Sequence, residues 1–242
     1  MRNLIRTFIL GLLLLPSNGA YAQSTLGLKA GISRTAWGGA AHGLWAIGTL
    51  PAADYEGTSF HVGGFLRSNS EAVFGAQIEL LYSARQAKTD INGSITYHDG
   101  FVTHTQTVTG QDEIDLRYLE LPCLMHVQVG EGLGLQAGGV LGILLNGRRT
   151  RDLQTTDAFS GSSSTSSVVD EDPVQMDDPG VLDIGVAFGV VYELEFGIGL
   201  GVRYSHGLTT TSLPSPFTTD IEPAEVHQRV LQGCIQYRFT RR

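Results

Sequence analysis

Apolar side chains alternate with small or polar ones along much of this chain, in stretches of roughly ten residues. A repeat of two residues is the period of a β-strand, in which successive side chains point to opposite faces. The clearest stretch sets an apolar row against a glycine-rich polar row: Phe196, Ile198, Leu200, Val202 and Tyr204 against Gly197, Gly199, Gly201, Arg203 and Ser205. Such stretches predict strands with one apolar and one polar face.

Eight stretches of this kind predict eight strands. The connections between them alternate strictly between long and short, as they do in bacterial outer-membrane barrels, where periplasmic turns are short and external loops are long. The predicted strands lie at about residues 24–33, 58–67, 72–83, 114–128, 133–144, 181–193, 196–206 and 227–239. The long connections lie at about 34–57, 84–113, 145–180 and 207–226.

The sequence therefore predicts an all-β fold, an eight-stranded antiparallel transmembrane β-barrel with up-and-down meander topology. Its apolar rows contact lipid and its polar rows line the lumen. A soluble lipocalin-like barrel is the structural alternative, but its apolar row would face inward and all its loops would be modest in length. A β-sandwich gives no reason for the alternation of loop lengths.

Two of the long connections have distinctive compositions. In the connection 84–113, the segment Ile95–Val108 is compatible with an extension of its hairpin beyond the membrane. The connection 145–180 contains a serine-rich run at 160–167, followed by Asp170-Glu171-Asp172. Low-complexity polar sequence of this kind predicts a solvated, mobile loop.

The first 22 residues have the features of a secretory signal peptide. Arg2 and Arg6 precede a short apolar core, and Ala20-Tyr21-Ala22 fits the small-residue cleavage rule. We therefore expect a signal peptide at 1–22 and a barrel domain at 23–242. Without Arg2 and Arg6, 14 basic residues face 24 acidic ones, a formal charge of −10. An acidic exported domain without a basic stripe is not expected to bind nucleic acid.

The two cysteines fall on different predicted faces. Cys123 is in phase with the outward apolar Leu121, and Cys234 is in phase with the inward Gln232. We expect two free thiols that act as small hydrophobic groups rather than a disulfide.

The inward rows carry charges of both signs. In a barrel of eight strands the interior is just wide enough for side chains to fill it, and charges removed from water need partners. We therefore expect a lumen charge network that conducts ions poorly, formed by Lys29, Arg67, Glu79, Glu120, Asp183, Glu193, Arg203 and Arg238. Aromatic residues near strand ends fit interfacial girdles: Phe60, Tyr82, Tyr118, Tyr192, Tyr204, Tyr237 and Phe239.

Several segments spread over the chain resemble the PorT-like outer-membrane β-barrel family of Bacteroidetes-type bacteria. They are Leu28-Lys29-Ala30-Gly31, Phe60-His61-Val62-Gly63, Ile78 to Ser83, Tyr118 to Pro122, Gly201 to Leu208 and Tyr237-Arg238-Phe239. The resemblance implies an eight-stranded barrel in the outer membrane. Some relatives take part in protein secretion and sorting, and most have no assigned activity.

Candidate chemistry is sparse. Ser205 and His206 are adjacent in a strand and point to opposite faces, so they do not form a nucleophile–base pair by themselves. The acidic runs at 170–172 and 177–178 lack the ordered ligand spacing of an EF-hand, and a solvated acidic loop is the preferred interpretation. We expect no catalytic residue, no metal site and no cofactor.

The function expected from these observations is a non-enzymatic outer-membrane scaffold whose long external loops bind a partner or surface. The loops would present Trp37, Trp45, Phe101, Phe159 and Phe217. The expected partners are outer-membrane lipid, the barrel-assembly machinery during biogenesis and a protein bound by the loops. The alternatives are a narrow solute channel or transporter, a lipid-modifying enzyme at the outer rim and an accessory of protein secretion.

Overall fold

The computed structural model describes residues 24–38, 55–68, 73–100, 102–159, 162–173, 182–213 and 224–239. The proposed signal peptide at 1–22 lies outside these residues. The described residues form nine strands: β1 (Ser24–Gly38), β2 (Tyr55–Ser68), β3 (Phe74–Asp99), β4 (Val102–Gln128), β5 (Leu133–Phe159), β6 (Ser162–Pro173), β7 (Leu182–Glu193), β8 (Ile198–Leu213) and β9 (Ala224–Arg238). No helix among them is long and apolar enough to cross a membrane.

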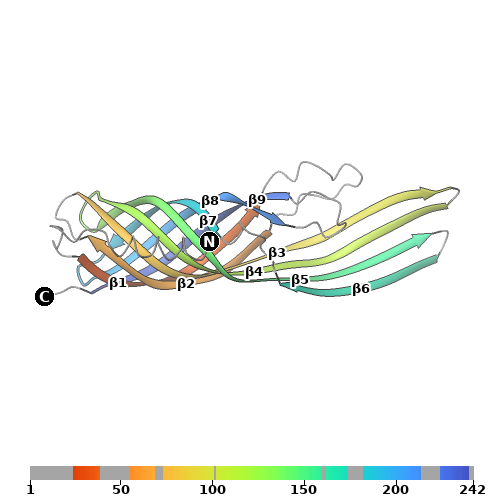
Figure 1. Cartoon of the computed structure of the whole chain (residues 1–242), viewed down its shortest axis with the longest axis horizontal. Helices are drawn as coiled ribbons and strands as arrows, with labels where there is room; N and C mark the ends of the chain where they lie inside the picture. Colours follow the sequence, from red (N-terminus) through yellow and green to blue (C-terminus); the bar gives the residue numbers. More distant parts are fainter. Residues whose placement is uncertain are drawn as a thin grey trace, which may run out of the picture.

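Eight of the strands close into a ring of antiparallel neighbours (Figure 1). Each strand pairs with the next in the order β1, β2, β3, β4, β5, β7, β8 and β9, and β9 returns to β1. The predicted eight-stranded antiparallel barrel with meander topology is therefore confirmed. The ninth strand, β6, lies outside the ring and pairs with β5 alone among the described strands.

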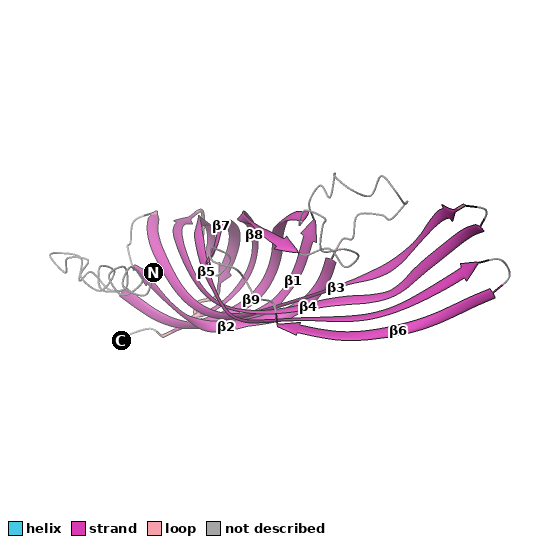
Figure 2. Cartoon of the chain, turned by 45° about the vertical axis from the view of Figure 1, so that its right-hand side comes forward, coloured by secondary structure: helices cyan, strands magenta, loops and turns pink. Residues whose placement is uncertain are grey.

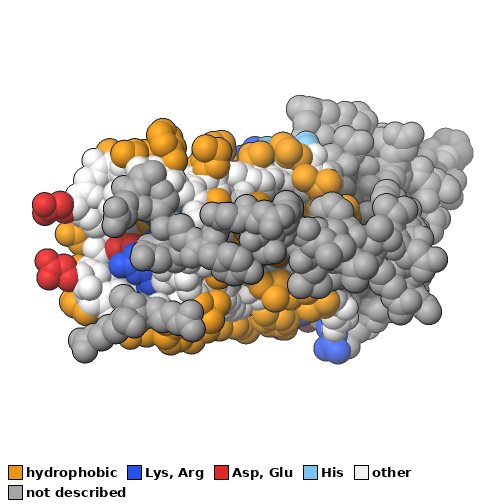
Figure 3. Space-filling view, turned by 60° about the vertical axis from the view of Figure 1, so that its left-hand side comes forward, with side chains coloured by type: hydrophobic (Ala, Val, Ile, Leu, Met, Phe, Trp, Pro, Cys, Tyr) orange, Lys and Arg blue, Asp and Glu red, His pale blue; other side chains and the backbone are white. Residues whose placement is uncertain are grey.

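The two rows of each barrel strand lie in different environments. The outward side chain of Ile32 is 67 % exposed, whereas that of its inward neighbour Lys29 on β1 is only 2 % exposed. Figure 3 shows hydrophobic side chains gathered over the outer face of the barrel. An exposed apolar face around a buried polar interior is the reverse of a water-soluble barrel and is the arrangement that a lipid environment favours.

Crowding inside the barrel explains two of the inward glycines. A Cβ atom on Gly27 would lie 2.2 Å from the ring of Phe65, which is itself an inward side chain. A Cβ atom on Gly134 would lie 2.2 Å from the His126 ring. These positions need glycine because large side chains from neighbouring strands occupy the space.

Three strands continue far beyond the length that a bilayer requires. A membrane-spanning β-strand needs about 9–11 residues, but β3, β4 and β5 have 26, 27 and 27 residues. With β6 they form a four-stranded sheet that runs out of the barrel on one side (Figures 1 and 2). We call this sheet the external sheet; it comprises 84–99 of β3, 102–117 of β4, 145–159 of β5 and all of β6.

The external sheet corrects two expected loops. The connection 84–113 is largely strand, and the extension expected for Ile95–Val108 is part of a continuous ladder from Leu81↔Glu120 to Asp99↔Val102. Residues 162–167 of the serine-rich run expected to be mobile lie in β6, which pairs with 148–159 of β5. Neither segment has the continuous apolar row along the strand that marks the barrel strands. Hydroxyl pairs cross the strands instead, for example Thr156 Oγ1 to Thr165 Oγ1 at 3.2 Å.

A β-bulge marks the boundary between barrel and external sheet. The β4–β5 register changes between Arg117 and Tyr118, so that Leu145 has no direct partner on β4. Bulges bend a strand and increase its local twist. This one lies where the outward row changes from the apolar Leu119 and Ile143 to the polar Arg117 and Asn146.

Candidate functional site

The middle of the barrel lumen is occupied by an ion-paired cluster around Glu79. Lys29 Nζ lies 3.2 Å from both of its carboxylate oxygens. Arg203 donates two parallel hydrogen bonds to it, at 2.7 and 2.6 Å. All three side chains are buried, and Arg203 also donates to Gln136 Oε1 at 3.0 Å. One buried carboxylate thus faces two buried cations.

A second cluster lies nearer the external sheet and has the opposite balance. Arg85 donates to Glu120 Oε1 at 3.1 and 2.6 Å and to Asp183 Oδ2 at 2.7 Å. Its guanidinium also lies over the Tyr118 ring, 4.3 Å from the centroid. Here one cation faces two carboxylates, which offsets the surplus positive charge of the Glu79 cluster.

A third cluster lies near the short turns. Arg67 Nη1 and Arg238 Nη1 both contact the Glu193 carboxylate, the second at 3.3 Å. Gln236 Nε2 also donates to Glu193 Oε1 at 2.9 Å, and Arg67 Nε donates to Gln77 Oε1 at 2.6 Å. Gln77 in turn donates to Glu79 at 2.5 Å, so the third cluster is joined to the one around Glu79.

Apolar side chains pack inside the external end of the barrel, above these clusters. Trp37, Tyr55, Ala87, Ile114, Leu116 and Tyr118 form one buried group, with Leu144 packed against it. Beside it, the buried Asp112 carboxylate accepts hydrogen bonds from Arg149 at 2.9, 3.1 and 2.5 Å and from the Tyr55 hydroxyl at 2.7 Å.

This arrangement holds the Tyr55 hydroxyl in its neutral form. Burial raises the pKa of Tyr55 well above its usual value, and the adjacent negative charge of Asp112 raises it further. Burial alone would lower the pKa of Arg149, but its hydrogen bonds to Asp112 outweigh that effect and leave the pKa raised. The external end therefore combines an apolar layer with a buried, hydrogen-bonded Asp112–Arg149 pair.

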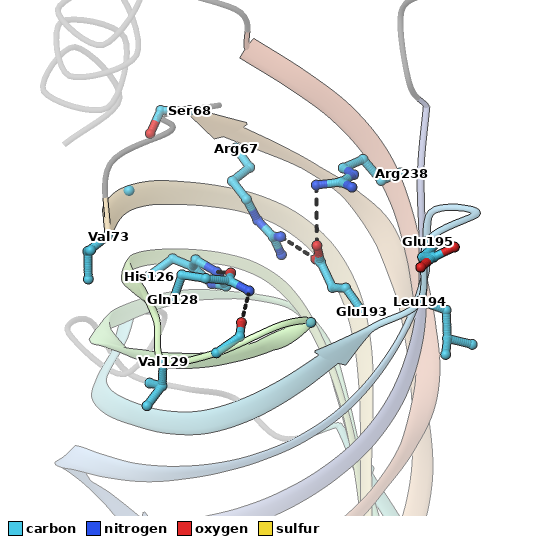
Figure 4. Close-up of a pocket in the computed structure, with 13 residues that line it drawn as sticks. Arg67, Ser68, Val73, His126, Gln128, Val129, Glu193, Leu194, Glu195 and Arg238 are labelled. Atoms are coloured by element: carbon cyan, nitrogen blue, oxygen red, sulfur yellow. Dashed lines mark hydrogen bonds and ion pairs between the residues drawn. The ribbon is translucent and has the colours of Figure 1, made fainter.

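A cavity of about 670 Å³ opens at the opposite end of the barrel, among the short turns (Figure 4). Arg67, Arg238 and Glu193 lie on its inner wall, and His126 and Gln128 lie beside them. The turn residue Gly130 also lines the cavity. The turn residue Glu195 lies at its edge. Because short turns of outer-membrane barrels are periplasmic, this cavity faces the periplasm.

All eight residues of the expected lumen network lie in these clusters. The structure brings together Lys29, Glu79 and Arg203 in one cluster and Arg67, Glu193 and Arg238 in another. It joins Glu120 to Asp183 through Arg85. Glu120 therefore pairs with Arg85, a residue outside the expected network.

Four residues of the polar interior were missed: Arg85, Asp112, Arg149 and Tyr55. Arg85, Asp112 and Arg149 lie in segments expected to be loops, and Tyr55 falls in another. A usable signal was present for Arg85, which is in phase with the inward positions Gln77 and Glu79 on the same strand. The strand predicted at 72–83 ended where its outward apolar row ends, two residues before Arg85.

Two aromatic residues also differ from expectation. Tyr118 is 2 % exposed and points into the lumen rather than to a lipid interface, because it lies in the same inward row of β4 as Glu120. Trp37 lies at the end of β1 and is buried in the apolar group, 6.2 Å from the Tyr55 ring, so it is not presented by a loop. Trp45, Phe101 and Phe217 lie outside the described residues.

The other residues considered as catalytic or metal-binding candidates do not form a site among the described residues. Ser205 and His206 share no hydrogen bond among the described residues, and the His206 ring stacks with Tyr204 and His227 at 6.5 and 5.9 Å. Asp170 forms an ion pair with Arg151 at 3.0 Å. In the described ranges, no group of three or more His, Cys, Asp or Glu could hold a metal ion. Cys123 is exposed, Cys234 is buried, and both thiols are free.

The family to which the chain belongs is shown by its sequence. The sequence model of the family described as "Outer membrane protein beta-barrel domain" matches residues 52–212. The chain belongs to this family. Its closed barrel and outward apolar rows agree with that membership, and the protein resides in the bacterial outer membrane. No curated protein matches the chain.

Solved structures similar to the chain include several outer-membrane proteins. The attachment invasion locus protein Ail of Yersinia pestis matches with 10 % identity and a TM-score of 0.40, covering 90 % of this chain and 99 % of Ail. Neisserial surface protein A matches with 12 % identity and a TM-score of 0.38, with the same coverage. OprG of Pseudomonas aeruginosa matches with 9 % identity and a TM-score of 0.32, covering 92 % and 99 %.

Proposed function

We propose that this family member is a non-enzymatic scaffold that holds the external sheet outside the cell for a binding partner. The observation that carries this proposal is the continuation of β3, β4 and β5 well past the apolar belt. The 16 residues from 84 to 99 extend roughly 50 Å at about 3.3 Å per residue. A barrel that served only as a membrane anchor would have no need of so long an ordered sheet.

The two faces of the external sheet differ in chemistry. One face carries an apolar row across all four strands, in which Ile91 is opposite Gly110, Gly110 opposite Leu153 and Leu153 opposite Val168. The other face carries hydroxyls in register, with Ser94 opposite Thr107, Thr107 opposite Thr156 and Thr156 opposite Thr165. Two such ordered faces provide distinct surfaces for recognition.

The edges of the external sheet are also suited to binding an extended segment. Among the described strands, 89–99 of β3 pairs with β4 alone, and β6 pairs with β5 alone. β6 has no lysine and no proline before its last residue, and Val169 is 71 % exposed. Residues 170–172 of β6 are charged and protect that part of the edge, whereas the uncharged edge at 162–169 can accept an added strand from a partner.

The lumen argues against the alternative of a narrow channel. Three ion-pair clusters and the apolar group at the external end occupy the interior, as Figure 4 shows for the cluster nearest the periplasm. Moving ions through such a lumen would require breaking buried ion pairs, which costs several kcal/mol each. Membership of the PorT-like family and a role as an accessory to protein secretion are more specific versions of this proposal.

Site-specific photocrosslinking in native membranes tests the proposal. A photoreactive residue in place of Val169 on β6 should give a discrete protein adduct. The same residue in place of Leu80, on the lipid-facing row of β3, is the matched control and should give lipid adducts only. Absence of protein adducts from Val169 and from Thr107 on the hydroxyl face would contradict a partner-binding role of the external sheet.

A further inference from the structure

The periplasmic cavity contains a buried guanidinium whose donors are only partly used. Arg67 is 4 % exposed and lines the cavity. Its Nε donates to Gln77, and its Nη1 donates to Glu193. Its Nη2 is buried and has no hydrogen-bond partner among the described residues. A buried charged donor without a partner is costly, so a ligand that accepts from it would be bound favourably.

A second unused group lies beside Arg67 in the same cavity (Figure 4). The Gln128 amide donates to the Gly130 carbonyl at 2.7 Å, which leaves its Oε1 to accept from His126 Nε2 at 3.3 Å. His126 Nε2 is thereby the protonated nitrogen, and Nδ1 is an acceptor. His126 Nδ1 is buried and has no partner in the described part of the chain.

The charges of the cavity favour an anion next to Arg67. Its inner wall has two guanidinium groups, from Arg67 and Arg238, and one carboxylate, from Glu193, a surplus of one positive charge. Glu195 is exposed on a turn at the rim and does not contact either arginine. A ligand carboxylate would balance the wall at the place where Arg67 Nη2 is unpaired.

The dimensions of the cavity suit a small organic ligand rather than a single ion. Its volume of about 670 Å³ falls within the range of roughly 300–1,000 Å³ that is usual for ligand pockets. The Gln77 and Glu79 side chains lie beyond Arg67 toward the middle of the lumen, so the cavity ends at the ion-pair cluster. A ligand can therefore enter only from the periplasmic side.

We propose that this cavity binds the carboxyl-terminal end of a peptide in the periplasm. The terminal carboxylate accepts a hydrogen bond from Arg67 Nη2. The last peptide N–H donates to His126 Nδ1. A peptide end carries a carboxylate and an N–H donor on the same Cα, whereas a free carboxylate such as acetate satisfies only Arg67.

Calorimetric titration of the folded full barrel in detergent micelles tests the proposal with three probes. N-acetyl-Ala-Ala with a free carboxylate should bind. The same dipeptide with an amidated end should bind at least about tenfold more weakly, since the charge-assisted hydrogen bond to Arg67 is lost. Acetate should also bind more weakly than the free-acid dipeptide. Equal binding of the amidated dipeptide, or of acetate, would overturn the proposal.

Two pairs of variants separate the site from general effects on folding. Gly130→Phe narrows the cavity without touching the ion pairs, since a Cβ atom at Gly130 meets no heavy atom within 4 Å. Gly233→Phe places the same side chain on the lipid-facing row, where the nearest atom is 3.9 Å away. The free-acid dipeptide should lose at least about tenfold in affinity with Gly130→Phe and keep its affinity with Gly233→Phe.

Arg67→Lys keeps the charge but removes the unpaired guanidinium nitrogen, and Arg34→Lys makes the same change in an exposed ion pair on the outer face. Binding should fall with Arg67→Lys and stay unchanged with Arg34→Lys. A shift in gel migration on boiling confirms that each variant has folded. Unchanged affinity in both folded cavity variants would show that the dipeptide binds elsewhere, and the assignment of the cavity would be wrong.

Discussion

Replacing Glu79 by glutamine should destabilise the barrel more than any comparable change on its surface. Glu79 is 1 % exposed and is the shared partner of Lys29 and Arg203, at 2.6 to 3.2 Å. The substitution conserves volume but leaves two buried cations without a carboxylate. Breaking a buried ion pair by removing one partner costs about 3–5 kcal/mol, and we expect a loss of free energy of unfolding in this range.

The matched control is Glu56→Gln. Glu56 accepts a hydrogen bond from Arg34 at 2.6 Å, but the two side chains are 54 % and 67 % exposed. An exposed pair is screened by water, so this substitution should cost less than about 1 kcal/mol. The two variants differ in burial and not in the chemistry of the change.

Urea unfolding from lipid vesicles, followed by tryptophan fluorescence, measures both costs. Trp37 is a suitable reporter because it is buried in the apolar group at the external end of the barrel. Addition of Lys29→Met to Glu79→Gln should recover part of the loss, since one of the two unpaired cations is removed. If Glu79→Gln and Glu56→Gln cost the same, the buried clusters do not stabilise the barrel as argued.

Three further predictions concern other parts of the molecule. Leu80→Arg on the lipid-facing row should reduce the free energy of unfolding by about 2–4 kcal/mol in the vesicle assay, whereas Thr107→Arg on the external sheet should change it little. The pKa of Tyr55 is raised in the folded state, so the protonated Tyr55 hydroxyl stabilises the folded protein below a pH of about 10. This stabilisation is lost as the pH rises toward the folded-state pKa. Tyr55→Phe should therefore reduce the loss of stability at alkaline pH. Deletion of 90–111 at the tip of the β3–β4 hairpin should leave the shift in gel migration on boiling intact, because that segment lies wholly in the external sheet.

The membrane-embedded part of the fold could be predicted from the sequence because lipid imposes a strict rule on it. Every outward position of a spanning strand must be apolar, so rows such as the one through Ile78 and Leu80 mark strand, face and register at once. The external sheet could not be predicted in the same way. Its strands have polar side chains on both faces, and a run such as Ser162 to Ser167 has the composition of a loop unless its pairing with β5 is known.

The residues of the polar interior could be predicted, but their partners could not. The alternation along the strand is sufficient to predict that the Glu120 side chain points into the lumen. Whether it meets Arg67, Lys29 or Arg85 depends on how far adjacent strands are staggered around the barrel, which alternation does not encode. The same limit applies to the periplasmic cavity, whose walls come from β2, β3, β4, β7, β9 and the turns between them.

The fold and the proposed function both require a barrel whose polar rows fill an enclosed lumen while its apolar rows contact lipid. Planar-bilayer recording of the folded protein tests this most directly. We predict insertion without steady conductance, since three ion-pair clusters and the external apolar group occupy the interior. A large, stable conductance from single inserted barrels would contradict it.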